Sequence, residues 1–107
     1  MLLKPQKIES EKLREWCKGQ SCTLRIPGVC KDNGRNTCGC HLNSNAKGWG
    51  NKSPDFLMVI GCYRCHEFID GGWVHTEWTK AEVQAEKLRA LKESLILYAK
   101  HGFLILN

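Results

Sequence analysis

The sequence predicts a small α+β fold stapled by zinc, with a short helix near the N-terminus and a long helix near the C-terminus. Three observations predict it: two cysteine pairs spaced like the halves of one zinc site, two short apolar segments between those pairs, and a long amphipathic stretch from Lys80 onward. A chain of 107 residues normally makes one domain. We divide it into an N-terminal helix (1–19), a zinc-bound core (20–72), and a C-terminal helix with its tail (73–107).

The first expected element is a helix over Ile8–Lys18. Ser10 can cap its start, and Gly19 follows its last residue. Its apolar side chains share one face, as a helix that packs on a core requires: Leu13, Trp16 and Cys17.

The zinc prediction depends on cysteine spacing. Two thiolates separated by two residues can hold one metal ion from a tight turn, so Cys62 and Cys65 form one half of a structural site. Cys22 and Cys30 are further apart, but a turn at Pro27-Gly28 can fold that segment back on itself. The sequence therefore predicts a structural zinc ion held by these four thiolates.

Disulfides and unligated thiols are the alternatives to zinc. The chain has seven cysteines, and no long apolar region follows Met1. Secreted disulfide frameworks favour an even number behind a leader, so we expect a reduced, cytoplasmic protein. The other three cysteines have no evident partner and are expected to be small buried apolar residues: Cys17, Cys38 and Cys40.

The middle of the chain is expected to form two strands and a short helix. Apolar character and turn residues place the first strand at Asn36–Leu42 and a buried second strand at Phe56–Ile60, separated by a polar loop over Asn43–Pro54. A helix is expected from near Cys62 to the Gly71-Gly72 pair.

The last clear element is a helix from Lys80 to about Lys100. Thr79 and Glu82 form a capping box at its start, and Gly102 follows its end. Apolar residues are expected along one side: Ala81, Ala85, Leu88, Leu91, Leu95 and Tyr98. Residues Phe103–Leu106 are expected to be a terminal strand or an apolar tail. No apolar run is long enough to suggest a membrane span.

This order resembles the HNH branch of the His-Me finger (ββα-metal) endonucleases, in the version braced by a four-cysteine zinc. More narrowly, it resembles a family of small phage and prophage proteins regarded as recombination-associated nucleases. The shared motifs lie within residues 20–72: Leu24-Arg25-Ile26-Pro27-Gly28-Val29-Cys30, Thr37 with Cys40-His41-Leu42, Pro54-Asp55, and Cys62-x-x-Cys65-His66-x-x-Ile69-Asp70.

The resemblance implies a catalytic site. His41 falls where the family places its general base, which would take a proton from the water attacking a phosphodiester. His66 falls where the family places a ligand of its single catalytic ion, which here would be Mg²⁺, Mn²⁺ or Zn²⁺. Asp70 lies one helical turn later and could share that ion. Asp55 could orient His41 or turn towards the ion.

Each of these roles has a structural alternative. His41 could be a hydrogen-bonded core histidine, and His66 could replace a cysteine in the zinc site. Asp70 could cap the turn that follows the helix, and Asp55 could be a turn residue. The chain also departs from the general HNH pattern, because Cys40 stands where an acidic or histidine ligand usually precedes the base, and the middle asparagine of the motif is missing.

Two functions follow. The first is a metal-dependent DNA endonuclease that takes part in phage DNA recombination or processing, and the second is a non-catalytic, zinc-stapled module that binds nucleic acid or acts as an adaptor. The net charge of +5 is compatible with DNA, double-stranded or branched, as the partner. Lys47, Lys52 and Arg64 are the expected DNA contacts. We expect a monomer or a homodimer that acts without a membrane.

Overall fold

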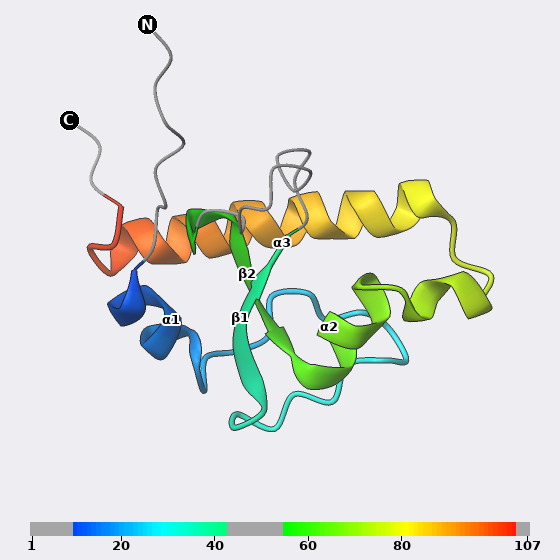
Figure 1. The fold of residues 1–107 in the computed structure, drawn as a ribbon, viewed down its shortest axis with the longest axis horizontal. Helices are drawn as coiled ribbons and strands as arrows, with labels where there is room; N and C mark the ends of the chain where they lie inside the picture. The colour runs from blue at the N-terminus through cyan, green and yellow to red at the C-terminus, as the bar shows by residue number, and fades with distance from the viewer. Residues whose placement is uncertain (1–9, 43–54, 105–107) are drawn as a thin grey trace, which may run out of the picture.

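The computed structural model describes residues 10–42 and 55–104, and Figure 1 shows their arrangement. A two-stranded sheet and a short helix lie beneath a long C-terminal helix, which runs along one side of the molecule. The elements in chain order are α1 (Glu11–Cys17), β1 (Thr37–His41), the 3₁₀ turn η2 (Asp55–Leu57), β2 (Met58–Cys62), α2 (Tyr63–Ile69), the 3₁₀ turn η3 (Gly72–His75) and α3 (Lys80–Lys100).

The two strands pair antiparallel, with Thr37 opposite Cys62 and His41 opposite Met58. β2 is buried along its whole length, as expected, but it begins at Met58 and ends at Cys62, two residues later than predicted at each end. The shift has a structural cause. Residues Asp55–Leu57 form the η2 turn, and the Asp55 carboxylate accepts a hydrogen bond from the backbone N–H of Ser10, the N-cap of α1. α2 follows β2 directly, so the described chain contains a β–β–α succession.

The predicted caps are confirmed. The Ser10 hydroxyl accepts a hydrogen bond from Leu13 N at the start of α1, and Thr79 and Glu82 form the reciprocal capping box of α3. The part of the predicted first helix before Ser10 lies outside the described residues. At the other end of the chain, Phe103 and Leu104 form no strand and pack against the core beside α1.

The buried side of α3 matches the predicted one only in part: Tyr98 is buried and Leu91 and Leu95 pack against the core, as expected, whereas Ala81, Ala85 and Leu88 are exposed. Its fully buried residues are Val83, Ala90, Ser94 and Tyr98, whereas Leu88 is 54% exposed. Ser94 explains the error, because this polar residue lies at the centre of the packed face: its hydroxyl accepts a hydrogen bond from Ile60 N and lies 3.2 Å from Thr23 Oγ1. A serine at a core position interrupts the apolar periodicity from which the buried face of a helix is predicted.

The outer edge of β2 is covered by side chains and by a loop. Tyr98 Oη donates to Met58 O at 2.8 Å, and Thr23 donates to Ile60 O through both its backbone N–H and its hydroxyl. Covering an edge in this way satisfies its polar groups and prevents pairing with another strand.

Two apolar clusters fill the interior, and α3 contributes to both. One surrounds the four-cysteine group and α2. The other joins α1, the start of β2 and Tyr98, against which Trp16 packs edge-on. Among the helices described here, none has the length and apolar character needed to cross a membrane.

Candidate metal centres and a histidine–aspartate pair

The four predicted zinc ligands come together in the structure. The sulfur atoms of Cys22, Cys30, Cys62 and Cys65 all lie within 4.8 Å of one another. A tetrahedral zinc–thiolate site with Zn–S bonds of about 2.3 Å has sulfur–sulfur edges of about 3.8 Å. Cys30 Sγ and Cys62 Sγ lie 3.8 Å apart, so the group has dimensions that fit a zinc ion and exceed those of a disulfide.

Local structure explains why the distant pair folds back. Val29 N and Cys30 N both donate to Ile26 O, and Gly28 takes a φ of +75° within that turn. Only glycine adopts this conformation at little cost, which confirms the turn predicted at Pro27-Gly28. Cys62 is the N-cap of α2, and its sulfur accepts a hydrogen bond from Cys65 N.

Backbone N–H groups point at the sulfurs of this group. Cys62 Sγ accepts from Lys31 N and Cys65 N, Cys65 Sγ accepts from Ile26 N, and Cys22 Sγ accepts from the N–H groups of residues 25 and 62. Burial opposes ionisation of the Cys62 thiol, but the N–H donors outweigh it and bring its pKa down to about 7. Such donors stabilise thiolate, the form that binds metal.

A second group of possible ligands was missed by the sequence reasoning. The sulfurs of Cys38 and Cys40 and a ring nitrogen of His66 also lie within 4.8 Å of one another. Cys17 and Cys40 are buried in the apolar core, as expected, whereas Cys38 is only half-buried. The signal was present in the sequence, because residues i and i+2 of a strand point to the same face.

The other candidate catalytic group lies at the end of β1, where His41 Nε2 is 2.8 Å from Asp55 Oδ1. Asp55 is buried, and its second oxygen accepts hydrogen bonds from Ser10 N and from the Arg14 guanidinium. Burial favours the neutral carboxyl, but Ser10 N–H, the His41 ring and Arg14 together hold the Asp55 pKa below its ordinary value. No sequence signal links Arg14 to Asp55, because 41 residues separate them.

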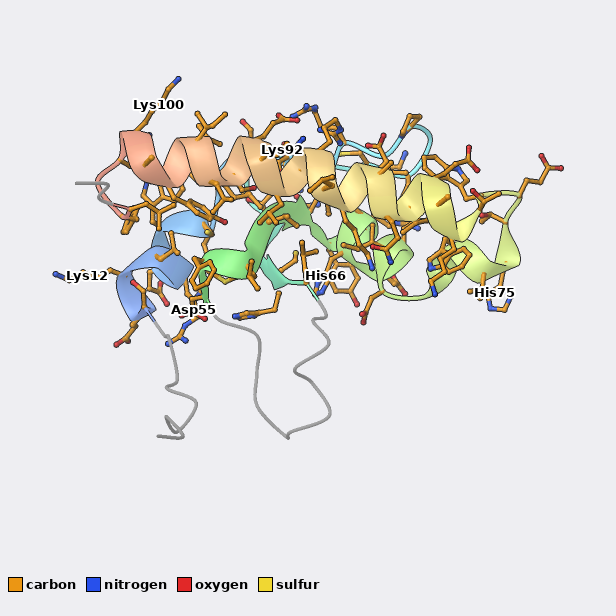
Figure 2. The ribbon with its side chains drawn as sticks, turned by 90° about the horizontal axis from the view of Figure 1, so that it is seen from above. Lys12, Asp55, His66, His75, Lys92 and Lys100 are labelled. Carbon is orange, nitrogen blue, oxygen red and sulfur yellow. The ribbon has the colours of Figure 1, made fainter. Side chains whose placement is uncertain are left out.

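His66 and Asp55 lie on the side of the molecule away from α3 in Figure 2. The structure does not add His41, Asp55 or Asp70 to either of the two ligand groups formed by its described residues. Asp70 is exposed at the C-cap of α2, where its backbone N–H donates to His66 O. Its predicted role as a metal ligand stays a prediction.

The predicted DNA contacts are only partly described. Arg64 is exposed and lines a cavity of about 320 Å³ together with Lys31, Glu67 and Phe68. Lys47 and Lys52 lie outside the described residues.

Comparisons with known proteins agree in pointing to one group. Residues 11–96 match the family described as "Putative nuclease YbcO". The chain is 32% identical over 92 residues to "Putative nuclease YbcO" of Escherichia coli strain K12 and, equally, to "Putative nuclease ybcO" of Enterobacteria phage 82, covering 84% of this chain and 93% of each relative.

A solved structure agrees with these matches. The structure titled "Structure of a putative bacteriophage protein from Escherichia coli str. K-12 substr. MG1655" is 26% identical, with a TM-score of 0.67 over 85% of this chain and 100% of the other. Both the sequence match over most of the chain and the matching backbone place the protein in the family of the putative nuclease YbcO.

Proposed function

We propose that this protein is a metal-dependent endonuclease that hydrolyses phosphodiester bonds in DNA. The observation that carries the proposal is the His41–Asp55 pair, a half-exposed imidazole held by a buried carboxylate at the end of β1. The names of the relatives, one of them from a phage, support a nuclease and a role in processing phage DNA. The β–β–α succession supports the His-Me finger class.

The pair defines which nitrogen of His41 can act. An ionised carboxylate only accepts hydrogen bonds, so the ring nitrogen facing Asp55 must carry the proton. Nε2 therefore donates to Asp55 Oδ1, and Nδ1 keeps a free lone pair. That lone pair is the group we assign to remove a proton from the attacking water. Asp55 acts through His41 as a positioning residue, and Arg14 and the backbone of Ser10 hold Asp55 in turn.

His66 is the residue we assign to the catalytic ion. When bound, a divalent ion here would stabilise the negative charge that develops on the phosphate and on the leaving oxygen. His66 is half-buried in the first turns of α2, whose start is fixed by Cys62 and Cys65. A zinc ion held by the four cysteines would act as a scaffold, since it would tie the start of the helix that carries His66 to the loop that precedes β1, the strand that ends at His41.

Nicking of supercoiled plasmid DNA tests the proposal. Wild-type protein is expected to nick in the presence of Mg²⁺, Mn²⁺ or Zn²⁺, and His41→Ala is expected to reduce the rate by about 100-fold or more, the usual contribution of a general base. His75→Ala is the matched control, because His75 is exposed and lies outside both ligand groups of the described chain. Nicking that survives His41→Ala would contradict the mechanism.

A folded, zinc-loaded wild type that binds DNA and nicks nothing with any ion would favour the alternative, a non-catalytic nucleic-acid-binding or adaptor module. In that case the His41–Asp55 contact would serve only to fasten η2 and α1 to the end of β1.

A further inference from the structure

We propose that Cys38, Cys40 and His66 form a second metal centre, which takes a thiophilic transition-metal ion such as Zn²⁺ and leaves one coordination position open. The inference deepens the proposed nuclease function, because it names the class of ion that would serve the same site. It stands on geometry that can be tested without any measurement of activity.

The first step is the placement of the three ligands. Cys38 and Cys40 are two residues apart on β1, so their side chains leave the same face of the strand. α2 brings His66 to that face, and the two sulfurs and one ring nitrogen lie within 4.8 Å of one another. Three ligands from two elements that the sheet and the zinc staple hold together form a preorganised set.

The second step is that Cys40 and His66 make few competing polar contacts within the described residues. Cys40 Sγ makes only long contacts to the carbonyl oxygens of Cys38 and Gly61, at 3.6 and 3.8 Å. Within the part of the chain that the structure describes, neither ring nitrogen of His66 has a hydrogen-bond partner. A half-buried imidazole facing two thiols, without a partner of its own, is available to coordinate an ion.

The space around Cys40 is also fitted to its sulfur. A Cβ added at Gly61, which lies opposite Cys38 in the sheet, would come within 3.1 Å of Cys40 Sγ and 2.7 Å of a Leu24 methyl group. Glycine at this position leaves the room that the sulfur occupies.

The third step is the chemistry of the ligands. Two thiolates and one imidazole are soft and borderline ligands that favour Zn²⁺ or Fe²⁺ and suit Mg²⁺ poorly, since Mg²⁺ prefers oxygen. Three protein ligands with an open fourth position are typical of catalytic zinc sites, whereas structural sites use four. The two centres therefore differ in kind: the four-cysteine group supplies a full set of four ligands, and this group supplies three.

Metal content tests the inference directly. Protein produced with added Zn²⁺ and then desalted is expected to carry two zinc ions per chain by mass spectrometry of the metal. His66→Gln and Cys38→Ser should each lower this to one, with an unchanged circular dichroism spectrum, because both residues are half-buried and outside the four-cysteine group. Cys17→Ala is the matched cysteine control and should keep two ions.

Cobalt provides a second readout. Titration of the metal-free protein with Co²⁺ should show two binding phases with thiolate-to-cobalt absorption, and His66→Gln should remove one of them. Excess Mg²⁺ should displace neither ion. One ion per wild-type chain, or two ions in both His66→Gln and Cys38→Ser, would overturn the second centre.

The outcome is separable from that of the nuclease proposal. Two bound ions in a protein that does not nick DNA would support this centre and contradict the proposed nuclease. Mg²⁺-dependent nicking by a protein that binds only one zinc ion per chain would support the nuclease and contradict this centre.

Discussion

Replacement of Asp55 by asparagine is the perturbation whose result the structure defines most closely. Asp55 uses both of its oxygens: Oδ1 faces His41 Nε2, and Oδ2 accepts from Ser10 N and from the Arg14 guanidinium. An asparagine has almost the same shape but only one acceptor oxygen, and its other end is an NH₂ donor. One side of the residue must therefore present a donor where the carboxylate presented an acceptor.

The side with two donors, one of them charged, should keep the oxygen. The NH₂ group then faces His41 and donates to Nε2, which must give up its proton, so that the proton moves to Nδ1. His41 would lose the free lone pair that we assign as the base. We expect Asp55→Asn to lower the rate of plasmid nicking by about 100-fold or more, comparable with loss of a general base.

The cost in stability should be smaller and should depend on pH. Hydrogen bonds to a charged group contribute about 1.5–3 kcal/mol each and neutral ones roughly half as much, so the loss of the carboxylate charge should lower the free energy of unfolding by about 1.5–3 kcal/mol at pH 7. Because the pKa of folded Asp55 lies below its unfolded value, its stabilising contribution is fully present above the unfolded pKa. It is lost as the pH falls through the folded value, so wild type and variant should converge in acid.

Urea denaturation between neutral and acid pH, together with the nicking assay, measures both effects. Glu77→Gln is the matched carboxylate-to-amide control, since Glu77 is exposed, and it should change neither quantity. An Asp55→Asn protein that nicks at the wild-type rate would refute the assignment of Nδ1 as the base. A difference in stability that grows in acid would refute the role given to the carboxylate.

Two further predictions concern the scaffold. Cys30→Ser removes a ligand of the four-cysteine group. Structural zinc contributes on the order of 10 kcal/mol to the stability of small zinc-dependent folds, so by circular dichroism the variant should melt far below wild type or fail to fold. An unchanged melting temperature would contradict a structural ion. Ser94→Ala leaves Ile60 N–H buried without its acceptor and should lower the free energy of unfolding by about 1–3 kcal/mol in urea denaturation. Ser21→Ala, at an exposed position, is the serine control and should leave that free energy unchanged.

Local signals in the sequence predicted local structure well. The Pro27-Gly28 turn, the Thr79 capping box and the start of a helix near Cys62 are each confirmed, because each is determined by residues close together in the chain. The four-cysteine group was predicted across 32 residues, between Cys30 and Cys62, since metal ligands have few alternatives.

What the sequence could not predict depends on long-range packing. The Arg14–Asp55 ion pair joins α1 to η2, and nothing in either segment marks the other as its partner. The buried face of α3 was partly misassigned because Ser94 bonds to Ile60 N–H, a use of a serine that only the packed structure reveals. The pairing of Cys38 and Cys40 with His66 requires the position of α2 relative to β1, which the sheet and the zinc staple set together.

The first turn of α2 connects stability with chemistry. Cys65 belongs to the closed four-cysteine group and His66, the next residue, belongs to the three-ligand group. Successive helical residues are about 100° apart around the axis, so the two side chains reach different centres from one turn. An ion held by the four cysteines would fix the orientation of that turn, and with it the direction in which His66 points. On our proposal the first ion is therefore a condition for the second centre as well as for folding, and it links the fold of this small chain to the proposed chemistry.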